Sequence, residues 1–310
     1  MVHLRPVILI AQPHLAPLLP ILAMQYDVMG LWEEAGRARL AEAEIMVTAG
    51  EFRLDPAMLA AMGRLRLIAC FTVGYDGVDL DWARANGIAV SHAGDANAED
   101  VADHAIGLIL AHRRQIVSGD RALRAGEWLP GGKTITRSIA GARLGIVGMG
   151  SIGIAIAARA DVLRMTTRWW GPRDKPSLAW PRSESLEALA AESDILVVAA
   201  RATDDNRGMI SAAIIDALGP NGLLVNVARG QLVDEDALID ALRAGRLGGA
   251  ALDVYAQEPT DPARWADVPN CILTPHTGGA TDAAVAQMAQ MLLANIRAFV
   301  AEEPLPNRVL

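Results

Sequence analysis

The chain has 310 residues, of which 52% are hydrophobic, and its formal net charge is -8 at pH 7. At roughly 150 residues per domain, this length predicts two domains. The acidic balance is spread without long runs of like charge, which argues against a nucleic-acid-binding protein and against a polybasic membrane patch. Cys70 and Cys271 both fall in apolar runs. They predict buried thiols rather than a disulfide framework or a metal site.

The N-terminal segment 1–22 is apolar but contains Pro6, Pro13, Pro17 and Pro20. It therefore matches neither the usual design of a signal peptide nor an unbroken membrane helix. We expect a soluble, cytoplasmic protein without a membrane partner.

Short apolar runs alternate with helix-like segments in the first part of the chain. The runs that predict strands are Val7–Ile10, Ile45–Thr48, Leu67–Phe71 and Ile88–Ser91. Helices are expected at Pro17–Gln25, Pro56–Met62 and Asp79–Asn86. This alternation is typical of a parallel sheet with helices on both faces.

The segment Asn97–Val117 carries apolar residues at helical spacing and predicts a long helix that connects two domains. Ser118–Arg143, rich in Gly and Arg, is expected to be irregular. A long helix at Asp282–Ala301 is expected to return to the first domain. The predicted domains are residues 1–98 with 284–310, and residues 99–283.

Between these long helices a second series of strands and helices is expected. The strand candidates begin at Leu144 and continue through Trp169–Trp170, Ile195–Ala200, Leu223–Val227, Ala250–Val254 and Ile272–Thr274. The helix candidates are Ser185–Glu192, Ala212–Leu218 and Glu235–Ala244.

The stretch LGIVGMGSIG, residues 144–153, has an apolar strand pattern before its glycines and a helical pattern after them. This setting is the one that a G-x-G-x-x-G dinucleotide site requires, although a glycine-rich turn alone is weak evidence. Gly148 permits the tight turn, Gly150 lets a pyrophosphate approach the backbone, and Gly153 lets the helix pack on the strand. The helix N-terminus, at Ser151 and Ile152, offers N–H groups to phosphates.

Polar residues end three of the later strands. Arg229 follows one strand, Asp253 ends the next with Glu258 in the loop beyond it, and His276 follows the last. Ligands of doubly wound sheets bind outside the carboxyl ends of the strands. Taken singly, these residues could be a surface ion pair, a helix cap, part of a turn and a solvated histidine.

Together the three types suit reduction of a 2-oxo acid. Arg229 can bind a carboxylate and polarise a carbonyl. His276 can protonate the carbonyl oxygen while hydride reaches carbon. A carboxylate such as Glu258 beside it orients the imidazole and favours imidazolium.

Several motifs resemble those of the D-isomer-specific 2-hydroxyacid dehydrogenase family. They are LGIVGMGSIG, NVARGQLVDEDAL, LDVYAQEP, PHTGGAT, FTVGYDGVDL and VADHAIGLILA. The resemblance implies that Arg229 binds substrate, that His276 is the acid/base with Glu258 as its partner, and that the backbone at Val73 and Gly74 holds the substrate carboxylate.

The resemblance also implies a fold. It is an α/β chain of two doubly wound parallel-sheet domains, a Rossmann-type cofactor domain and a flavodoxin-like substrate domain, with the active site in the cleft between them. Homodimers are usual in the family, and Ser118–Arg143 would then contribute to the dimer contact.

The cofactor preference depends on the end of the second strand of the cofactor domain. NAD sites place an acidic residue there for the ribose 2′-hydroxyl, but this chain has Gly171 between Trp170 and Arg173. Arg173 could pair with a 2′-phosphate, so we expect NADP(H) rather than NAD(H). The other residues expected to bind cofactor are Ala228, Asp253 and Gly278.

The expected activity is NADPH-dependent reduction of a small, glyoxylate- or hydroxypyruvate-like 2-oxo acid. An NAD-dependent dehydrogenase of phenylpyruvate or phosphoglycerate type stays open, as does a non-enzymatic, dinucleotide-sensing regulator. Candidates for the wall of the substrate pocket are Trp32, Phe52, Tyr75 and Trp265.

Overall fold

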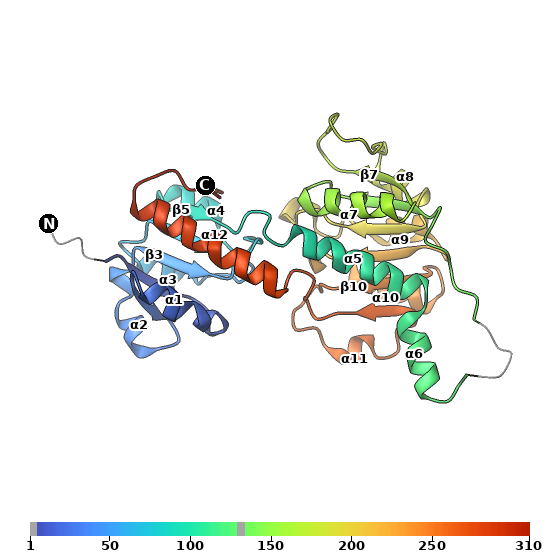
Figure 1. Cartoon of the computed structure of the whole chain (residues 1–310), viewed down its shortest axis with the longest axis horizontal. Coiled ribbons are helices and arrows are strands. Elements are labelled where there is room, and N and C mark those ends of the chain that lie inside the picture. The colour runs from blue at the N-terminus through green and yellow to red at the C-terminus, as the bar shows by residue number, and fades with distance from the viewer. Residues whose placement is uncertain (1–4, 129–133) are drawn as a thin grey trace. The chain divides into compact units, whose positions relative to one another are not determined.

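The computed structural model describes residues 5–128 and 134–310. The chain divides into two compact units, Met1–Asn97 with Asp282–Leu310, and Ala98–Thr281. The divisions fall at 97/98 and 281/282, where the sequence placed them at 98/99 and 283/284. Each unit contains one sheet whose strands all run parallel (Figure 1). The prediction of an α/β chain with two parallel sheets is therefore confirmed.

The sheet of the first unit has five strands in the order β2-β1-β3-β4-β5, which is the flavodoxin-like order. Its strands are β1 (Val7–Ile10), β2 (Asp27–Gly30), β3 (Ile45–Thr48), β4 (Leu67–Cys70) and β5 (Ala89–Ser91). Its helices are η1 (Pro13–Leu18), α1 (Leu19–Ala23), α2 (Glu34–Ala38), η2 (Leu40–Glu42), α3 (Pro56–Ala61), α4 (Leu80–Ala85) and α12 (Asp282–Val300).

Both faces of this sheet are buried, which explains why its strands are continuous apolar runs rather than alternating ones. In β1, Ile8 and Ile10 pack with residues of α1 and α12. Val7 and Leu9 point to the other face, where they pack with residues of α3 and α4.

Helix α12 is the one described helix that is long and apolar enough to cross a membrane. Its residues Ala284, Met288, Leu292 and Ile296 lie in the buried core of the first unit. These contacts identify α12 as a core helix of that unit.

The sheet of the second unit has six strands in the order β11-β10-β9-β8-β6-β7. Its strands are β6 (Arg143–Val147), β7 (Thr166–Trp170), β8 (Ile195–Val198), β9 (Leu223–Asn226), β10 (Gly249–Leu252) and β11 (Cys271–Leu273). Its helices are α5 (Ala98–Arg113), α6 (Ile116–Arg124), α7 (Ser151–Val162), α8 (Leu186–Ala191), η3 (Asp204–Asn206), α9 (Ala212–Leu218), η4 (Gly230–Leu232), α10 (Glu235–Arg243) and α11 (Pro262–Trp265).

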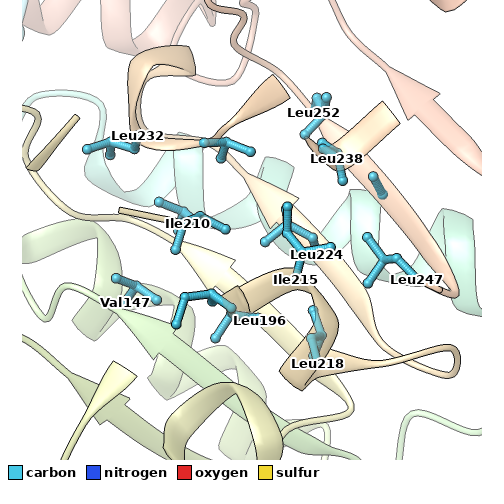
Figure 2. Close-up of a cluster of buried hydrophobic side chains, with 14 of the residues drawn as sticks. Val147, Leu196, Ile210, Ile215, Leu218, Leu224, Leu232, Leu238, Leu247 and Leu252 are labelled. Atoms are coloured by element: carbon cyan, nitrogen blue, oxygen red, sulfur yellow. The ribbon is translucent and has the colours of Figure 1, made fainter. Parts of the chain in front are cut away.

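Alternate residues of these strands also enter separate cores. Leu196 and Leu224 pack with residues of α8, α9 and α10 in the cluster shown in Figure 2. Ile195 and Val225 point to the opposite face, against α5 and α7. Two buried faces leave the ends of the strands as the place where loops can carry polar chemistry.

Several local features differ from the prediction. The edge strand β2 and the short helix α2 were not predicted. The long helix ends at Arg113 rather than Val117, because Gln115 adopts a left-handed φ of 51° and a new helix, α6, starts at Ile116. Part of the segment expected to be irregular is therefore helical. Residues 129–133 of that segment lie outside the described residues.

The two cysteines are free. Cys70 ends β4 and Cys271 begins β11, so both lie in strands as expected. Cys70 is buried, whereas Cys271 is only half-buried. Burial raises the pKa of each thiol to about 12, which keeps both in the unreactive thiol form.

Candidate active site

The loops that carry the predicted site residues of the second unit follow four strands of one sheet. The glycine loop follows β6, Arg229 follows β9, Asp253 follows β10 and His276 follows β11. Because these strands are parallel, their carboxyl ends share one edge of the sheet. The structure thus brings these loops to the same edge.

The glycine loop has the geometry that its sequence predicted. Gly148 has a φ of 95°, and a Cβ there would lie 2.5 Å from the Ala200 Cα. A Cβ on Gly153 would lie 2.2 Å from the Gly148 carbonyl oxygen. A Cβ on Gly150, by contrast, would meet no atom of the described residues within 4 Å. Gly148 and Gly153 are therefore fixed by packing, while Gly150 leaves open space in front of the N-terminus of α7.

The end of β7 is rich in cations. Gly171 directly follows the strand, and Arg173 is exposed. Lys175 donates a hydrogen bond of 2.7 Å from Nζ to the Met149 carbonyl, within the glycine loop. Arg182 donates one of 2.7 Å to the Gly171 carbonyl. Gly171, the position directly after the strand, carries no carboxylate.

His276 and Glu258 form a close pair. The His276 Nδ1 lies 2.6 Å from Glu258 Oε2, and both side chains are about one-third exposed, at 36% and 35%. The other carboxylate oxygen of Glu258 accepts the Tyr255 N–H at 2.9 Å. With Nδ1 donating to the carboxylate, the Nε2 atom of His276 is left to exchange protons with a ligand.

The pair changes the pKa values of both groups. The hydrogen bond to Glu258 raises the pKa of His276 above its ordinary value of 6.5, although burial and the charge of Arg229 oppose the shift. Burial alone would raise the pKa of Glu258, but the hydrogen bonds from His276 and the Tyr255 N–H hold it below its usual value. An imidazolium beside a carboxylate is thus the favoured state.

The Arg229 loop packs directly on the loop that carries Glu258. A Cβ on Gly230 would lie 1.8 Å from the Tyr255 carbonyl carbon, so only glycine fits there. The half-buried Arg229 donates from Nη1 to the Ala228 carbonyl at 2.8 Å. The guanidinium of Arg229 is close enough to affect the pKa values of both Glu258 and His276. Arginine, glutamate and histidine therefore form one cluster.

The sequence did not predict how these loops are held. The buried Glu235, on α10, accepts a hydrogen bond from the Ala256 N–H. It also forms an ion pair with Arg264, whose Nε lies 3.1 Å from Glu235 Oε2. The Tyr255 hydroxyl donates to the Thr274 carbonyl at 2.8 Å.

His104, on α5, lies 3.3 Å from Asp253. His104 falls inside the VADHA motif, but nothing in its spacing indicates a partner so far along the chain.

Two predicted cofactor residues, Asp253 and Gly278, contact each other. The Gly278 N–H donates to Asp253 Oδ2 at 2.8 Å. Ala228 is buried, and its N–H donates to the Asn226 side chain at 3.1 Å. Trp170 is half-buried at the end of β7. A role of these four residues in cofactor binding stays a prediction.

Val73 and Gly74 belong to the first unit, in the loop after β4. The Val73 carbonyl lies 3.1 Å from the His92 ring, and the Thr72 hydroxyl bridges the Gly50 N–H and the Glu51 carboxylate. These hydrogen bonds fix the loop within its unit, and its role in substrate binding stays a prediction.

Trp265, a candidate for a pocket wall, lies in the interior of its unit, and its role in a pocket stays a prediction. It is 6% exposed and belongs to the core of the second unit, where its ring meets that of Tyr255 edge-on. The described residues hold no group of three or more His, Cys, Asp or Glu side chains arranged for a metal ion.

Comparison with known proteins agrees with the resemblance seen in the motifs. Residues 106–278 match the family model of the D-isomer specific 2-hydroxyacid dehydrogenase NAD binding domain. These residues lie within the second unit.

Curated relatives include a hydroxyphenylpyruvate reductase of Plectranthus scutellarioides, 39% identical over 81% of this chain and 80% of the relative. Another is a glyoxylate/hydroxypyruvate reductase A of Arabidopsis thaliana, 40% identical over 79% of this chain and 78% of the relative. Among solved structures, an NADPH-dependent glyoxylate/hydroxypyruvate reductase from Sinorhizobium meliloti, in complex with NADP and malonate, matches with a TM-score of 0.89. It shares 32% identity over 98% of this chain and 97% of that one.

Proposed function

We propose that this chain, which belongs to the D-isomer specific 2-hydroxyacid dehydrogenase family, reduces a glyoxylate- or hydroxypyruvate-like 2-oxo acid to the D-2-hydroxy acid with NADPH. The family consists of NAD(P)-dependent 2-oxo acid reductases, and the second unit is its NAD-binding domain. The specific substrate and the preference for NADPH are the proposed parts.

The observation that carries the proposal is the pair of His276 and Glu258, with Arg229 beside it. Reduction of a carbonyl needs a proton at oxygen when hydride arrives at carbon. The Nε2–H of an imidazolium supplies that proton, and Glu258 keeps the ring charged and oriented through Nδ1. Arg229 binds the carboxylate of the substrate through its guanidinium and polarises the carbonyl.

When bound, the nicotinamide cofactor supplies the hydride. The glycine loop has the right form to bind it, since the open space at Gly150 faces the N-terminus of α7, where the N–H groups of the first turn favour an anion. The absence of an acidic residue directly after β7 and the exposed cation of Arg173 support NADPH over NADH.

The choice of substrate rests on the relatives. The Arabidopsis and Sinorhizobium proteins are described as acting on glyoxylate and hydroxypyruvate, while the Plectranthus protein is described as a hydroxyphenylpyruvate reductase. A substrate with a small side chain is favoured by the number of relatives with the first description, since four further relatives are named glyoxylate reductase.

The direct experiment is an absorbance assay with NADPH or NADH and a panel of 2-oxo acids. The panel holds glyoxylate, hydroxypyruvate, pyruvate, phenylpyruvate and hydroxyphenylpyruvate. We expect the highest kcat/KM with NADPH and one of the first two acids. Binding of NADPH without turnover of any 2-oxo acid would support a dinucleotide-sensing regulator instead.

The matched variant is His276→Ala. Loss of the proton donor should lower kcat by about 10²–10⁴-fold, the usual contribution of general acid catalysis. The affinity for NADPH, measured by fluorescence titration, should stay close to that of the unsubstituted protein. Near-normal turnover by His276→Ala would exclude His276 as the acid.

We also propose that the chain forms a homodimer through α6. No residue of this helix is buried, and two of its large apolar side chains, Ile116 and Leu123, are 56% and 57% exposed. They lie seven positions apart, which places them on the same face of the helix. An apolar face that the described residues leave exposed fits a contact with a second copy.

A further inference from the structure

We infer that Asp253 and His104 are positioning residues for the acid/base histidine: together they hold the turn 274–278 in the conformation that presents His276 to Glu258. The inference rests on the proposed function, because it assigns a purpose to the geometry of His276. It also gives Asp253 a role beyond the cofactor contact that the sequence predicted.

Asp253 is the centre of the turn's hydrogen bonds. Its Oδ1 accepts the Thr274 hydroxyl at 2.6 Å and the Thr277 N–H at 2.9 Å. Its Oδ2 accepts the Gly278 N–H at 2.8 Å, and its own carbonyl accepts the His276 N–H at 2.8 Å. Four residues of a five-residue turn are thus tied to a single aspartate.

The turn needs such an anchor because of its backbone. His276 has a φ of 52°, in the left-handed region that residues other than glycine seldom adopt. A side chain in this region is strained, and such strain persists only where the surroundings fix it. The contacts with Asp253 fix it directly, since they flank His276 on both sides.

His104 completes the anchor from a separate element, α5. The Thr274 hydroxyl gives its one proton to Asp253, so it can only accept from His104, whose Nε2 lies 3.0 Å away. The same Nε2 lies 3.3 Å from Asp253 Oδ1. His104 therefore donates from Nε2, and its ring fixes the Thr274 hydroxyl and the carboxylate in place.

The environment of Asp253 fixes the position of its carboxylate. The side chain is 3% exposed, and both oxygens accept hydrogen bonds from the turn. Burial alone would raise the pKa of Asp253, but the hydrogen bonds from His104, Thr274 and the Thr277 and Gly278 N–H groups lower it. The carboxylate is thus anionic and held in place by the turn that it anchors.

Gly278 shows how tightly this anchor is packed. A Cβ there would lie 2.8 Å from Asp253 Oδ2 and 3.3 Å from His104 Cδ2. The carboxylate and the imidazole therefore fill the space beside Gly278, so even a methyl group would disturb the anchor.

The cleanest test is Thr274→Val, which removes the hydroxyl without changing formal charge. Misplacement of His276 should lower kcat by about 10- to 100-fold, while the Kd for NADPH changes by less than about twofold. Thr274→Ser keeps the hydroxyl and should restore most of the kcat. Thr166→Val, at an exposed position of β7, is the control for the same substitution elsewhere.

The pH profile gives a readout that general loosening of the fold would not produce. With the turn relaxed, His276 moves away from Glu258 and loses the contact that raises its pKa. The pH at which reduction declines should then be lower in Thr274→Val than in the unsubstituted protein. An unchanged kcat and an unchanged pH profile in this variant would overturn the inference.

Asp253→Asn and His104→Gln complete the design. Asp253→Asn should behave like Thr274→Val in kcat, because an amide cannot accept all the bonds of the turn. His104→Gln keeps an N–H donor and should lose less activity than His104→Leu. A kcat of Asp253→Asn equal to that of the unsubstituted protein would overturn the inference.

These outcomes are distinct from failure of the proposed function, which would appear as no turnover by the unsubstituted protein. In that case the position of the turn can still be followed without turnover. The pKa of His276, measured by NMR, should fall in Thr274→Val but not in Thr166→Val. An equal pKa in both variants would contradict the inference.

Discussion

At the scale of single residues, the proposed chemistry depends on a carboxylate that raises the pKa of a histidine. Glu258 lies 2.6 Å from the His276 ring and raises its pKa. The imidazolium is therefore present over a wider range of pH than it would be for an isolated histidine.

Glu258→Gln should move the decline of 2-oxo acid reduction to lower pH. Reduction uses the protonated ring and is lost as pH rises through the pKa of His276, and the amide removes the charge that raises this pKa. The measurement is kcat against pH for the reduction of the best substrate. Glu184→Gln, an exposed glutamate, should leave the profile unchanged. A profile of Glu258→Gln that coincides with this control would contradict the role of Glu258.

Arg173→Ala should raise the KM for NADPH much more than the KM for NADH. A hydrogen bond to a charged group contributes about 1.5–3 kcal/mol, so the effect on NADPH should be about 10- to 100-fold. Steady-state kinetics with both cofactors test this, and Arg207→Ala removes another exposed arginine as a control. Equal effects on the two cofactors would show that Arg173 does not bind a 2′-phosphate.

At the scale of elements, the glycines of the loop after β6 have two separate functions, packing of the helix on the strand and space for a ligand. Gly153 is required because α7 approaches the Gly148 carbonyl, whereas no atom of the described residues restricts Gly150. Gly153 is therefore required by the fold, and the space beside Gly150 is left for a ligand.

Gly153→Ala and Gly150→Ala should consequently fail in different ways. The first overpacks the junction of strand and helix and should lower the free energy of unfolding by about 1–3 kcal/mol. The second should leave the melting temperature unchanged and weaken NADPH binding, because its methyl group would occupy the space of the pyrophosphate. Thermal melts and fluorescence titrations separate the two effects. Normal NADPH affinity in Gly150→Ala would place the pyrophosphate elsewhere.

The sequence predicted those elements that bury apolar side chains on two faces. Strands such as β8 (Ile195–Val198) were found because every residue is buried and apolar. The edge strand β2 was missed because it contains Asp27 and Gly30 and only its last residue is buried. Helix α6 was missed since none of its residues is buried and its Gly119 lowers helix propensity.

The same reasoning explains which site residues were predicted. Arg229, Glu258 and His276 were predicted because each follows an apolar strand, where a polar residue is conspicuous. His104 and Glu235 lie within helices, where charged residues are ordinary. Their partners, Asp253 and Ala256, are distant in sequence, so only the folded structure reveals these contacts.

At the scale of the whole molecule, the apolar face of α6 predicts self-association. Light scattering after size-exclusion chromatography should give the mass of a dimer. Leu123→Glu places a charge on that face and should give the mass of a monomer, because a buried unpaired charge destabilises an interface. Ser118→Glu adds the same charge at a polar position of α6 and should remain dimeric. A monomeric unsubstituted chain at micromolar concentration would contradict this prediction.

The divided course of the first unit has a consequence for how the protein is made. Ala284, Met288, Leu292 and Ile296 of α12 complete a core that begins with β1, and the Val309 N–H donates to the Val90 carbonyl. During translation the ribosome must therefore synthesise all of residues 98–281 before the first sheet can be covered. The nascent chain carries an uncovered apolar sheet face through that interval, a state prone to aggregation. The second unit, whose segments are contiguous, is thus the first able to fold as the chain emerges.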